Sequence, residues 1–294
     1  MYWEPEGGDP GEHAPRFRVT DLIWETELRD QGPWNEVETV PGVPGRFWAA
    51  QEGDTGHTLV VCDACSSSLD AAWELGHKGL LPEWGSVLAI SQTAGRGQLR
   101  RRWESPPGNV YAALMLPDPP PHGVHWPLVV GYLLAEGLEH LGVHVTLKWP
   151  NDLVLEGAKV GGVLVEERRG VCVAGIGLNV NSCPLPDRIR ADAALQATCL
   201  DEFGHRFTPL HLWRHLVQSM ESWYQDVVIS LPSPEIIARI QNRLAFLGRR
   251  VRTSEFHGNA VEGIVVGLTP EGGIRLRTDG EEIALVSGSI YPFP

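Results

Sequence analysis

Arginine, glycine and tryptophan are concentrated in one short stretch of this chain, from Gln92 to Trp103. The stretch holds four arginines and two glycines, although the whole chain carries a formal net charge of −13. Glycine lets backbone N–H groups approach an anion, and arginine supplies forked donors that suit phosphate oxygens. A terminal tryptophan offers a flat face to a nucleobase. These residue types predict a loop that closes over a nucleotide phosphate; a solvated basic loop beside a packed tryptophan is the alternative.

A second group of residues capable of chemistry runs from Lys148 to Asp152, with the sequence Lys-Trp-Pro-Asn-Asp. Proline interrupts strand pairing and Asn-Asp favours a turn, so an ammonium, an amide and a carboxylate are predicted within one bend. Hydrophobic alternation before the motif predicts that Lys148 faces away from the core. A hairpin should follow, in which Lys159 starts the return strand and Gly161-Gly162 marks a bulge or a nearby ligand.

Two further stretches could line a polar ligand site. Residues 66–68 are all serine and stand between a predicted strand, 58–62, and a predicted helix, 69–76. A serine there can cap the helix, and free N–H groups at a helix start can receive a polar ligand. In the predicted strand 171–181, alternation places two glycines and two asparagines on one face, at positions 175, 177, 179 and 181. We interpret that face as the floor of a polar pocket.

Bulk properties narrow the class of protein. At 294 residues the chain has room for two domains, and its pI of about 5.3 disfavours non-specific binding to nucleic acid or anionic membranes. No apolar run approaches the roughly 20 residues of a spanning helix, and the N-terminus lacks the order of a signal peptide. Five cysteines, an odd number, suit reduced thiols, and Cys62 and Cys65 are expected at a strand end. A cytoplasmic location is therefore expected.

Composition divides the chain into three parts. Residues 1–55 form an acidic extension rich in Pro and Gly, with twelve acidic residues against four arginines. Its charge disfavours a DNA-reading helical module, and it shows little helical periodicity. Residues 56–244 contain strands and amphipathic helices, including 208–230 and a helix from 233 to about 244. Residues 245–294 read as short strands separated by glycine turns, which predicts a small β-barrel.

Taken together and in order, four motifs resemble those of the biotin protein ligase family. They are residues 67–70, residues 95–103, residues 148–152, and the ligand strands 159–166 and 175–181. The likeness covers about residues 58–290. It implies an α+β fold: a mixed β-sheet with packed helices, of the class II synthetase-like biotin/lipoate ligase type, plus an SH3-like C-terminal barrel. The winged-helix repressor module of some family members has no counterpart in residues 1–55.

The resemblance implies a two-step ligase, in which residues 56–244 form the catalytic domain. Biotin and ATP, with Mg²⁺, would give biotinyl-AMP, and the biotinyl group would pass to a lysine of a biotin carboxyl carrier domain. No DNA and no membrane partner are expected, because residues 1–55 are acidic and no apolar run is long enough to span a bilayer. A monomer or homodimer is expected. A lipoate–protein ligase, a biotin-sensing regulator and an inactive paralogue are the alternatives.

The resemblance also implies roles for individual residues. Catalytic roles fall on Arg96, Asp152 and Lys159. Biotin contacts fall on Ser67, Ser68, Leu69, Gln92, Gly95, Arg96, Gly97, Gln98, Lys159 and Gly162. ATP contacts fall on Arg101, Trp103, Lys148, Asn151 and Asn179. No side-chain cluster forms a metal site, so Mg²⁺ is expected through the phosphates, with Asp152 as a candidate aid. The chain departs from the family pattern at Gln98 (an arginine in the family), Arg100 (a glycine) and Leu69 (an asparagine).

Overall fold

A computed structural model describes residues 1–4, 22–31, 33–37, 46–50, 56–98, 101–117, 125–168, 170–184, 195–253 and 260–293. The chain forms two compact units. The first comprises residues 1–118, 164–183 and 199–218, and the second comprises residues 119–163, 184–198 and 219–294. Strands and helices are mixed in both units, which confirms the predicted α+β class.

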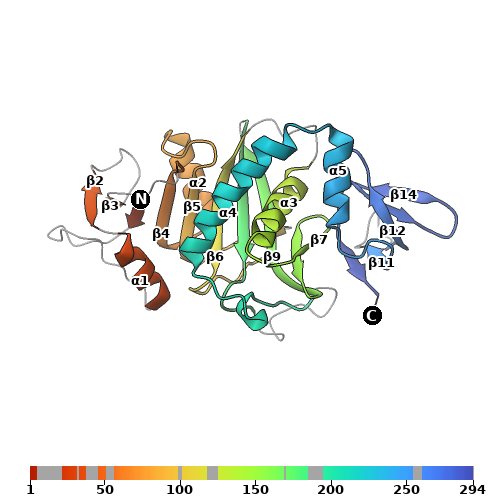
Figure 1. Cartoon of the computed structure of the whole chain (residues 1–294), viewed down its shortest axis with the longest axis horizontal. Helices are drawn as coiled ribbons and strands as arrows, with labels where there is room; N and C mark the ends of the chain where they lie inside the picture. The colour runs from red at the N-terminus through yellow and green to blue at the C-terminus, as the bar shows by residue number, and fades with distance from the viewer. Residues whose placement is uncertain are drawn as a thin grey trace. The chain divides into compact units, whose positions relative to one another are not determined.

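A mixed sheet forms the centre of the first unit, with the strand order β2-β3-β1-β4-β5-β6-β10. The strands are β1 (Tyr2–Glu4), β2 (Trp34–Val37), β3 (Arg46–Ala50), β4 (Leu59–Cys65), β5 (Ser86–Gln92), β6 (Val110–Leu116) and β10 (Val171–Leu178). β4 runs parallel to both β1 and β5, whereas β6 is antiparallel to both β5 and β10. The predicted strands 58–62 and 171–181 are therefore confirmed as β4 and β10, and β5 and β6 lie between them. Figure 1 shows β4, β5 and β6 side by side.

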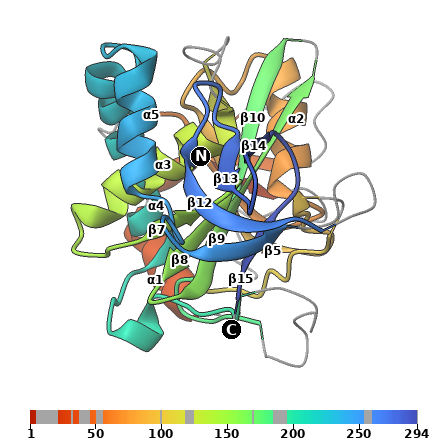
Figure 2. The ribbon, with the colours of Figure 1, turned by 90° about the vertical axis from the view of Figure 1, so that its right-hand side faces the viewer.

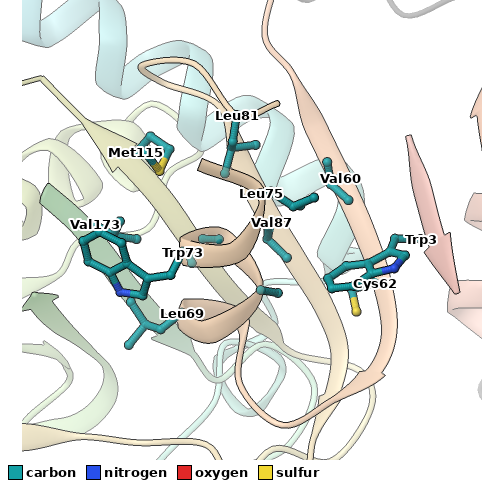
Figure 3. Packing of buried hydrophobic residues seen from close by; sticks show 13 residues of the cluster. Trp3, Val60, Cys62, Leu69, Trp73, Leu75, Leu81, Val87, Met115 and Val173 are labelled. Atoms are coloured by element: carbon teal, nitrogen blue, oxygen red, sulfur yellow. The ribbon is translucent and has the colours of Figure 1, made fainter. Parts of the chain in front are cut away.

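Helices cover both faces of this sheet. Helix α2 (Ser68–His77) contacts β4, β5, β6 and β10, and its buried side chains join a cluster that includes Leu69, Trp73 and Val87 (Figure 3). Alternation places Ser86 on the opposite face from Val87. There the buried indole of Trp213, from α4 (Pro209–Trp223), donates a 3.0 Å hydrogen bond to the Ser86 hydroxyl.

The acidic N-terminal segment is built into the first unit. β1 extends the sheet beside β4, and the buried side chain of Trp3 packs in the core cluster. The expectation of little helix was wrong, because α1 spans Leu22–Asp30. Trp24 and Leu28, one turn apart on α1, are fully buried, so packing of this one face stabilises a helix with a weak local signal.

The second unit combines helices with a short hairpin. Its helices are α3 (Trp126–Glu139) and α5 (Ser233–Asn242), and its strands are β7 (Thr146–Lys148), β8 (Asp152–Leu155) and the start of β9 (Ala158–Arg168). β9 continues along the chain into the first unit. The predicted hairpin is confirmed. Its bulge lies next to the two glycines and not at them: Leu153 stands opposite Gly161 and Val154 opposite Lys159, so Val160 is the extra residue. α3 ends three residues before Gly142, which then turns the chain at φ +77°.

The described residues also include two shorter helical turns: a 3-10 helix at Asp201–Phe203 and a π-helical turn at Tyr224–Val228 that continues α4.

A five-stranded antiparallel sheet ends the chain, in the order β14-β13-β12-β11-β15 (Figure 2). Its strands are β11 (Arg250–Thr253), β12 (Glu262–Leu268), β13 (Ile274–Arg277), β14 (Glu282–Leu285) and β15 (Ile290–Pro292). Sequence patterns predicted the first four. They missed β15, whose three residues are too few to show alternation.

The cysteines agree with the expectation of reduced thiols, because all five are free. Cys62 is buried and Cys65 is half-buried at the end of β4. Across the part of the chain that the structure describes, the helices are all too short or too polar to cross a bilayer.

Candidate active site

In the first unit the basic stretch folds back on itself as a narrow loop. The Gly97 N–H donates to the Arg101 carbonyl at 2.7 Å, and the Trp103 N–H donates to the Gly95 carbonyl at 2.9 Å. A Cβ on Gly95 would lie 2.7 Å from the Trp103 carbonyl oxygen, so a side chain there would force the two strands of the loop apart. The glycine at position 95 is thus required by the loop itself. Leu99 and Arg100 lie outside the described residues.

Carboxylates engage the first arginine of this loop. Both terminal nitrogens of Arg96 donate to Asp70, at 2.8 Å each, and one lies 3.8 Å from Glu166. The hydrogen bonds from Asp70 raise the pKa of Arg96 above its ordinary value. In this conformation Arg96 joins the loop to the first turn of α2.

The serine segment lies at the start of α2, and both Ser67 and Ser68 are buried. The predicted serine cap was wrong, because the Ser67 side chain makes no capping hydrogen bond. Instead the Ser68 N–H donates to Oε1 of Gln92 at 2.8 Å, and Nε2 of Gln92 donates to the Ser105 hydroxyl at 2.9 Å. Gln92, the last residue of β5, therefore orients the serine segment and the end of the loop together.

The glycine face of β10 is covered by apolar side chains. A Cβ on Gly175 would lie 2.9 Å from the Leu69 side chain, and a Cβ on Gly177 would lie 2.5 Å from the Trp103 ring. The two glycines are needed because Leu69 and Trp103 lie directly on the strand. We had interpreted this face as the floor of a polar pocket. In this structure Leu69 and Trp103 cover it instead.

A buried asparagine that sequence reasoning missed fixes the end of β10. Oδ1 of Asn109 accepts hydrogen bonds from the backbone N–H groups of Val180, Asn181 and Ser182, at 2.8 to 3.2 Å. The backbone carbonyl of the neighbouring Asn179, also buried, accepts from the Leu200 N–H. Position 109 follows Pro-Pro-Gly, a turn signal that suggested a strand start but no contact with a distant segment.

In the second unit the Lys-Trp-Pro-Asn-Asp motif forms the predicted bend, and it carries a compact charged cluster. Nζ of Lys148 lies 2.9 Å from Oδ2 of Asp152, and Nζ of Lys159 lies 2.5 Å from Oδ1 of the same carboxylate. Lys148 does stand opposite the core-facing Leu147, but it is not exposed: only 4% of its side chain is accessible. Alternation gave its face correctly but could not show what covers that face.

Asp152 is ionised in this cluster. Burial disfavours the charged carboxylate, but the two ammonium groups outweigh it and lower the pKa of Asp152. Asp152 stands opposite Gly162 in the β8–β9 register, and Nδ2 of Asn151 donates to the Val163 carbonyl at 2.6 Å. Three candidate ligand residues of this unit are thus held by the same hairpin.

The comparisons agree with this architecture. Residues 68–181 match the biotin/lipoate A/B protein ligase family, and residues 246–291 match the biotin protein ligase C-terminal domain. Over 237 residues the chain is 30% identical to the bifunctional ligase/repressor BirA of Bacillus subtilis, covering 76% of this chain and 70% of that protein. The chain belongs to the biotin protein ligase family.

Other relatives of this ligase-family chain extend the likeness to almost its full length. It is 25% identical to the biotin–[acetyl-CoA-carboxylase] ligase of Mycobacterium tuberculosis over 291 residues, which cover 94% of this chain and 97% of that enzyme. Among solved structures, the biotin protein ligase of Aquifex aeolicus in complex with biotin and ATP aligns with a TM-score of 0.66 and 26% identity. That alignment covers 79% of this chain and 97% of the other.

One signal in the sequence could have drawn more attention to the charged cluster. The chain contains only three lysines, Lys78, Lys148 and Lys159. The last two form ion pairs with the carboxylate of Asp152. A chain that uses arginine at most of its positively charged positions has lysine at these two, where a compact ammonium fits beside a carboxylate. Within the described ranges, no group of three histidine, cysteine, aspartate or glutamate side chains could hold a metal ion.

Proposed function

We propose that this chain activates biotin with ATP to form biotinyl-AMP and then transfers the biotinyl group to a lysine of a biotin carboxyl carrier domain. The observation that carries the proposal is the pair of lysines on Asp152, in a chain of the biotin protein ligase family. Joining a carboxylate to a phosphate brings two anions together, so fixed positive charge lowers the barrier. The cluster has a formal charge of +1, from two ammonium groups and one carboxylate.

Roles for the remaining residues follow from their chemistry. In the first unit, Ser67, Ser68 and Gln92 offer neutral donors and acceptors that suit the ureido ring of biotin. Arg96 and Arg101 offer charge to the carboxylate and the phosphates, and Trp103 offers a flat face to adenine. The neighbours Leu69, Gly95, Gly97 and Gln98 shape the biotin side.

In the second unit, Lys159 is the proposed partner of the biotin carboxylate and then of the anhydride oxygens. Lys148 and Asn151 are proposed to contact ATP, as is Asn179 of the first unit, whereas Gly162 leaves room for the ligand beside the strand.

The residues present do not fit a Mg²⁺ ion held by the protein. Each oxygen of Asp152 already accepts from an ammonium group, at 2.5 and 2.9 Å. We therefore propose that Mg²⁺ enters with the phosphates of ATP. The proposal also includes a biotin carboxyl carrier domain as the partner, a monomeric or dimeric state and a cytoplasmic location. It includes domain boundaries after residues 55 and 244.

Exchange of radioactive pyrophosphate into ATP tests the first step. We expect exchange that depends on biotin, followed by transfer to a biotin carboxyl carrier domain when one is added. Lipoate in place of biotin tests the alternative lipoate–protein ligase, which the match of residues 246–291 to the biotin ligase C-terminal domain disfavours. No exchange with biotin, or exchange with lipoate alone, would contradict the proposal and favour an inactive paralogue or a lipoate ligase.

A further inference from the structure

The C-terminal sheet of the second unit reaches the buried Lys148. The Ser289 hydroxyl, immediately before β15, accepts a hydrogen bond from Nζ of Lys148 at 3.1 Å. The ring of Tyr291, within β15, lies with its centroid 5.7 Å from the same nitrogen. Ser289, just before β15, and Tyr291, within β15, therefore both lie at the ammonium of Lys148, which is 141 positions away from Ser289 in sequence.

The same sheet is fixed on the motif that carries Lys148. The buried indole of Trp149 donates to the Gly272 carbonyl at 3.0 Å, in the turn between β12 and β13. The C-terminal sheet thus contacts two successive residues of the motif: the segment 289–291 contacts Lys148, and the turn at Gly272 contacts Trp149. Because the indole contact fixes the turn, the position of Ser289 relative to Lys148 is set by the sheet as a whole.

A buried ammonium group needs hydrogen-bond acceptors for its N–H donors. Lys148 is such a group, because only 4% of its side chain is accessible. An ammonium has three donors. One is directed at Asp152 and one at Ser289. The four-carbon side chain of lysine is flexible, and two acceptors on different segments restrict it to the rotamers that reach both. With Asp152 alone, the side chain could keep that one bond while Nζ moves around the carboxylate.

We infer that Ser289 is a positioning residue that orients the ammonium of Lys148, so that the C-terminal sheet contributes to the charged cluster. The inference rests on the proposed function for the role of Lys148 toward ATP, but the contact itself does not depend on it. Tyr291 supports the same orientation through its ring face. The cluster then comprises Ser289, Lys148, Asp152 and Lys159 in one connected row.

The test compares Ser289→Ala with Ser289→Thr, which keeps the hydroxyl. Gln241→Ala is the matched control: Oε1 of Gln241, in α5, accepts the Leu268 N–H of the same sheet at 3.1 Å but does not contact Lys148. In biotin-dependent pyrophosphate exchange, Ser289→Ala should raise KM for ATP about tenfold, the equivalent of about 1.4 kcal/mol. KM for biotin should stay unchanged. Ser289→Thr should restore KM for ATP, and Gln241→Ala should leave both constants unchanged while lowering Tm.

A second measurement does not require any activity. Acetic anhydride labels accessible amines, and the exposed Lys78 serves as an internal reference in a chain with only three lysines. The ratio of Lys148 to Lys78 labelling should rise severalfold in Ser289→Ala and not in Gln241→Ala. If labelling and KM for ATP are both unchanged in Ser289→Ala, or if Gln241→Ala matches its effects, the inference is wrong. If the wild-type protein lacks exchange but the labelling ratio responds, the proposed function fails and the positioning contact stands.

Discussion

At the scale of single residues, the central feature is a carboxylate shared by two lysines. Asp152 keeps its charge because Lys159 and Lys148 outweigh the cost of burying it. The two ammonium groups each lie on one oxygen of the same carboxylate, so they can act on one ligand with little reorganisation. Lys159 is 29% accessible, whereas Lys148 is 4% accessible, so the two lysines differ in what they can reach. The more accessible one is the better candidate for the biotin carboxylate.

Replacing Lys159 by alanine should abolish formation of biotinyl-AMP while leaving the fold intact. Removing one fixed donor to a developing negative charge typically lowers the rate on the order of 10²- to 10³-fold. Asp152 would keep Lys148 as a partner, so the cluster would not be left with an unpaired carboxylate. Pyrophosphate exchange and thermal unfolding measure the two effects. Lys78→Ala, at an exposed lysine, is the control, and near-normal exchange in Lys159→Ala would remove this residue from the site.

The lowered pKa of Asp152 also predicts a dependence of stability on pH. A group whose folded pKa lies below its unfolded value stabilises the fold above the unfolded pKa, about 4, and this contribution is lost as pH falls through the folded pKa. Asp152→Asn should therefore lower the free energy of unfolding by about 3 kcal/mol at pH 7, since it leaves the buried ammonium of Lys148 without its charged partner. Urea titrations from pH 7 to pH 3 should show this difference constant down to about pH 4 and smaller below it. A difference that grows toward low pH would contradict the assignment.

At the scale of elements, periodic segments were predictable and long-range contacts were not. Alternation located β10, and helical spacing located α4 and α5, because each of these elements buries a face that its own residues define. The same patterns could not show that Gln92, rather than a serine, holds the start of α2. Nor could they show that the ring of Trp103 packs against Gly177. The Gln92–Ser68 and Trp103–Gly177 contacts each join segments that are far apart in sequence. For the same reason the motif residues could be found, but the partners that orient them could not.

The basic loop illustrates such a partner, since Asp70 on α2 holds Arg96 through both of its oxygens. We expect Asp70→Asn to loosen the loop in the absence of ligand. A half-buried, bidentate pair of this kind contributes about 1 kcal/mol, so the open population should rise about fivefold. Trypsin cleavage after the exposed Arg101 and Arg102 measures that population directly. Glu282→Gln, which removes a carboxylate that pairs with two arginines of the C-terminal sheet, is the control, and cleavage equal to wild type in Asp70→Asn would contradict the tether.

At the scale of the whole molecule, charge sets what the chain can bind. The formal net charge is −13, and residues 1–55 alone hold twelve acidic residues against four arginines. Binding to duplex DNA depends on cations that neutralise phosphates, so an acidic segment of this kind disfavours it. We expect no retardation of duplex DNA in a gel at physiological salt, with or without biotin and ATP. A biotin-dependent shift at nanomolar protein would instead favour a biotin-sensing regulator.

The N-terminal segment has a structural role in the first unit that can be tested at one residue. Glu27 on α1 accepts hydrogen bonds from the N–H groups of Leu210 and His211, at 3.1 and 3.0 Å, and so caps the start of α4 from a segment more than 180 positions away. A carboxylate at a helix N-terminus satisfies unpaired donors and complements the helix dipole. Glu27→Ala should therefore lower the free energy of unfolding by about 1 to 2 kcal/mol. Urea denaturation measures the change.

Glu25→Ala is the matched control, because Glu25 lies on the same helix, carries the same charge and pairs with the exposed Arg29 one turn away. An exposed pair of this kind contributes about 0.3 to 0.5 kcal/mol, so its loss should be clearly smaller than that of the cap. Glu27→Gln separates charge from hydrogen bonding, since the amide oxygen can accept only one of the two N–H groups well. It should fall between wild type and Glu27→Ala. Equal effects of Glu25→Ala and Glu27→Ala would show that the carboxylate of Glu27 does not stabilise the start of α4.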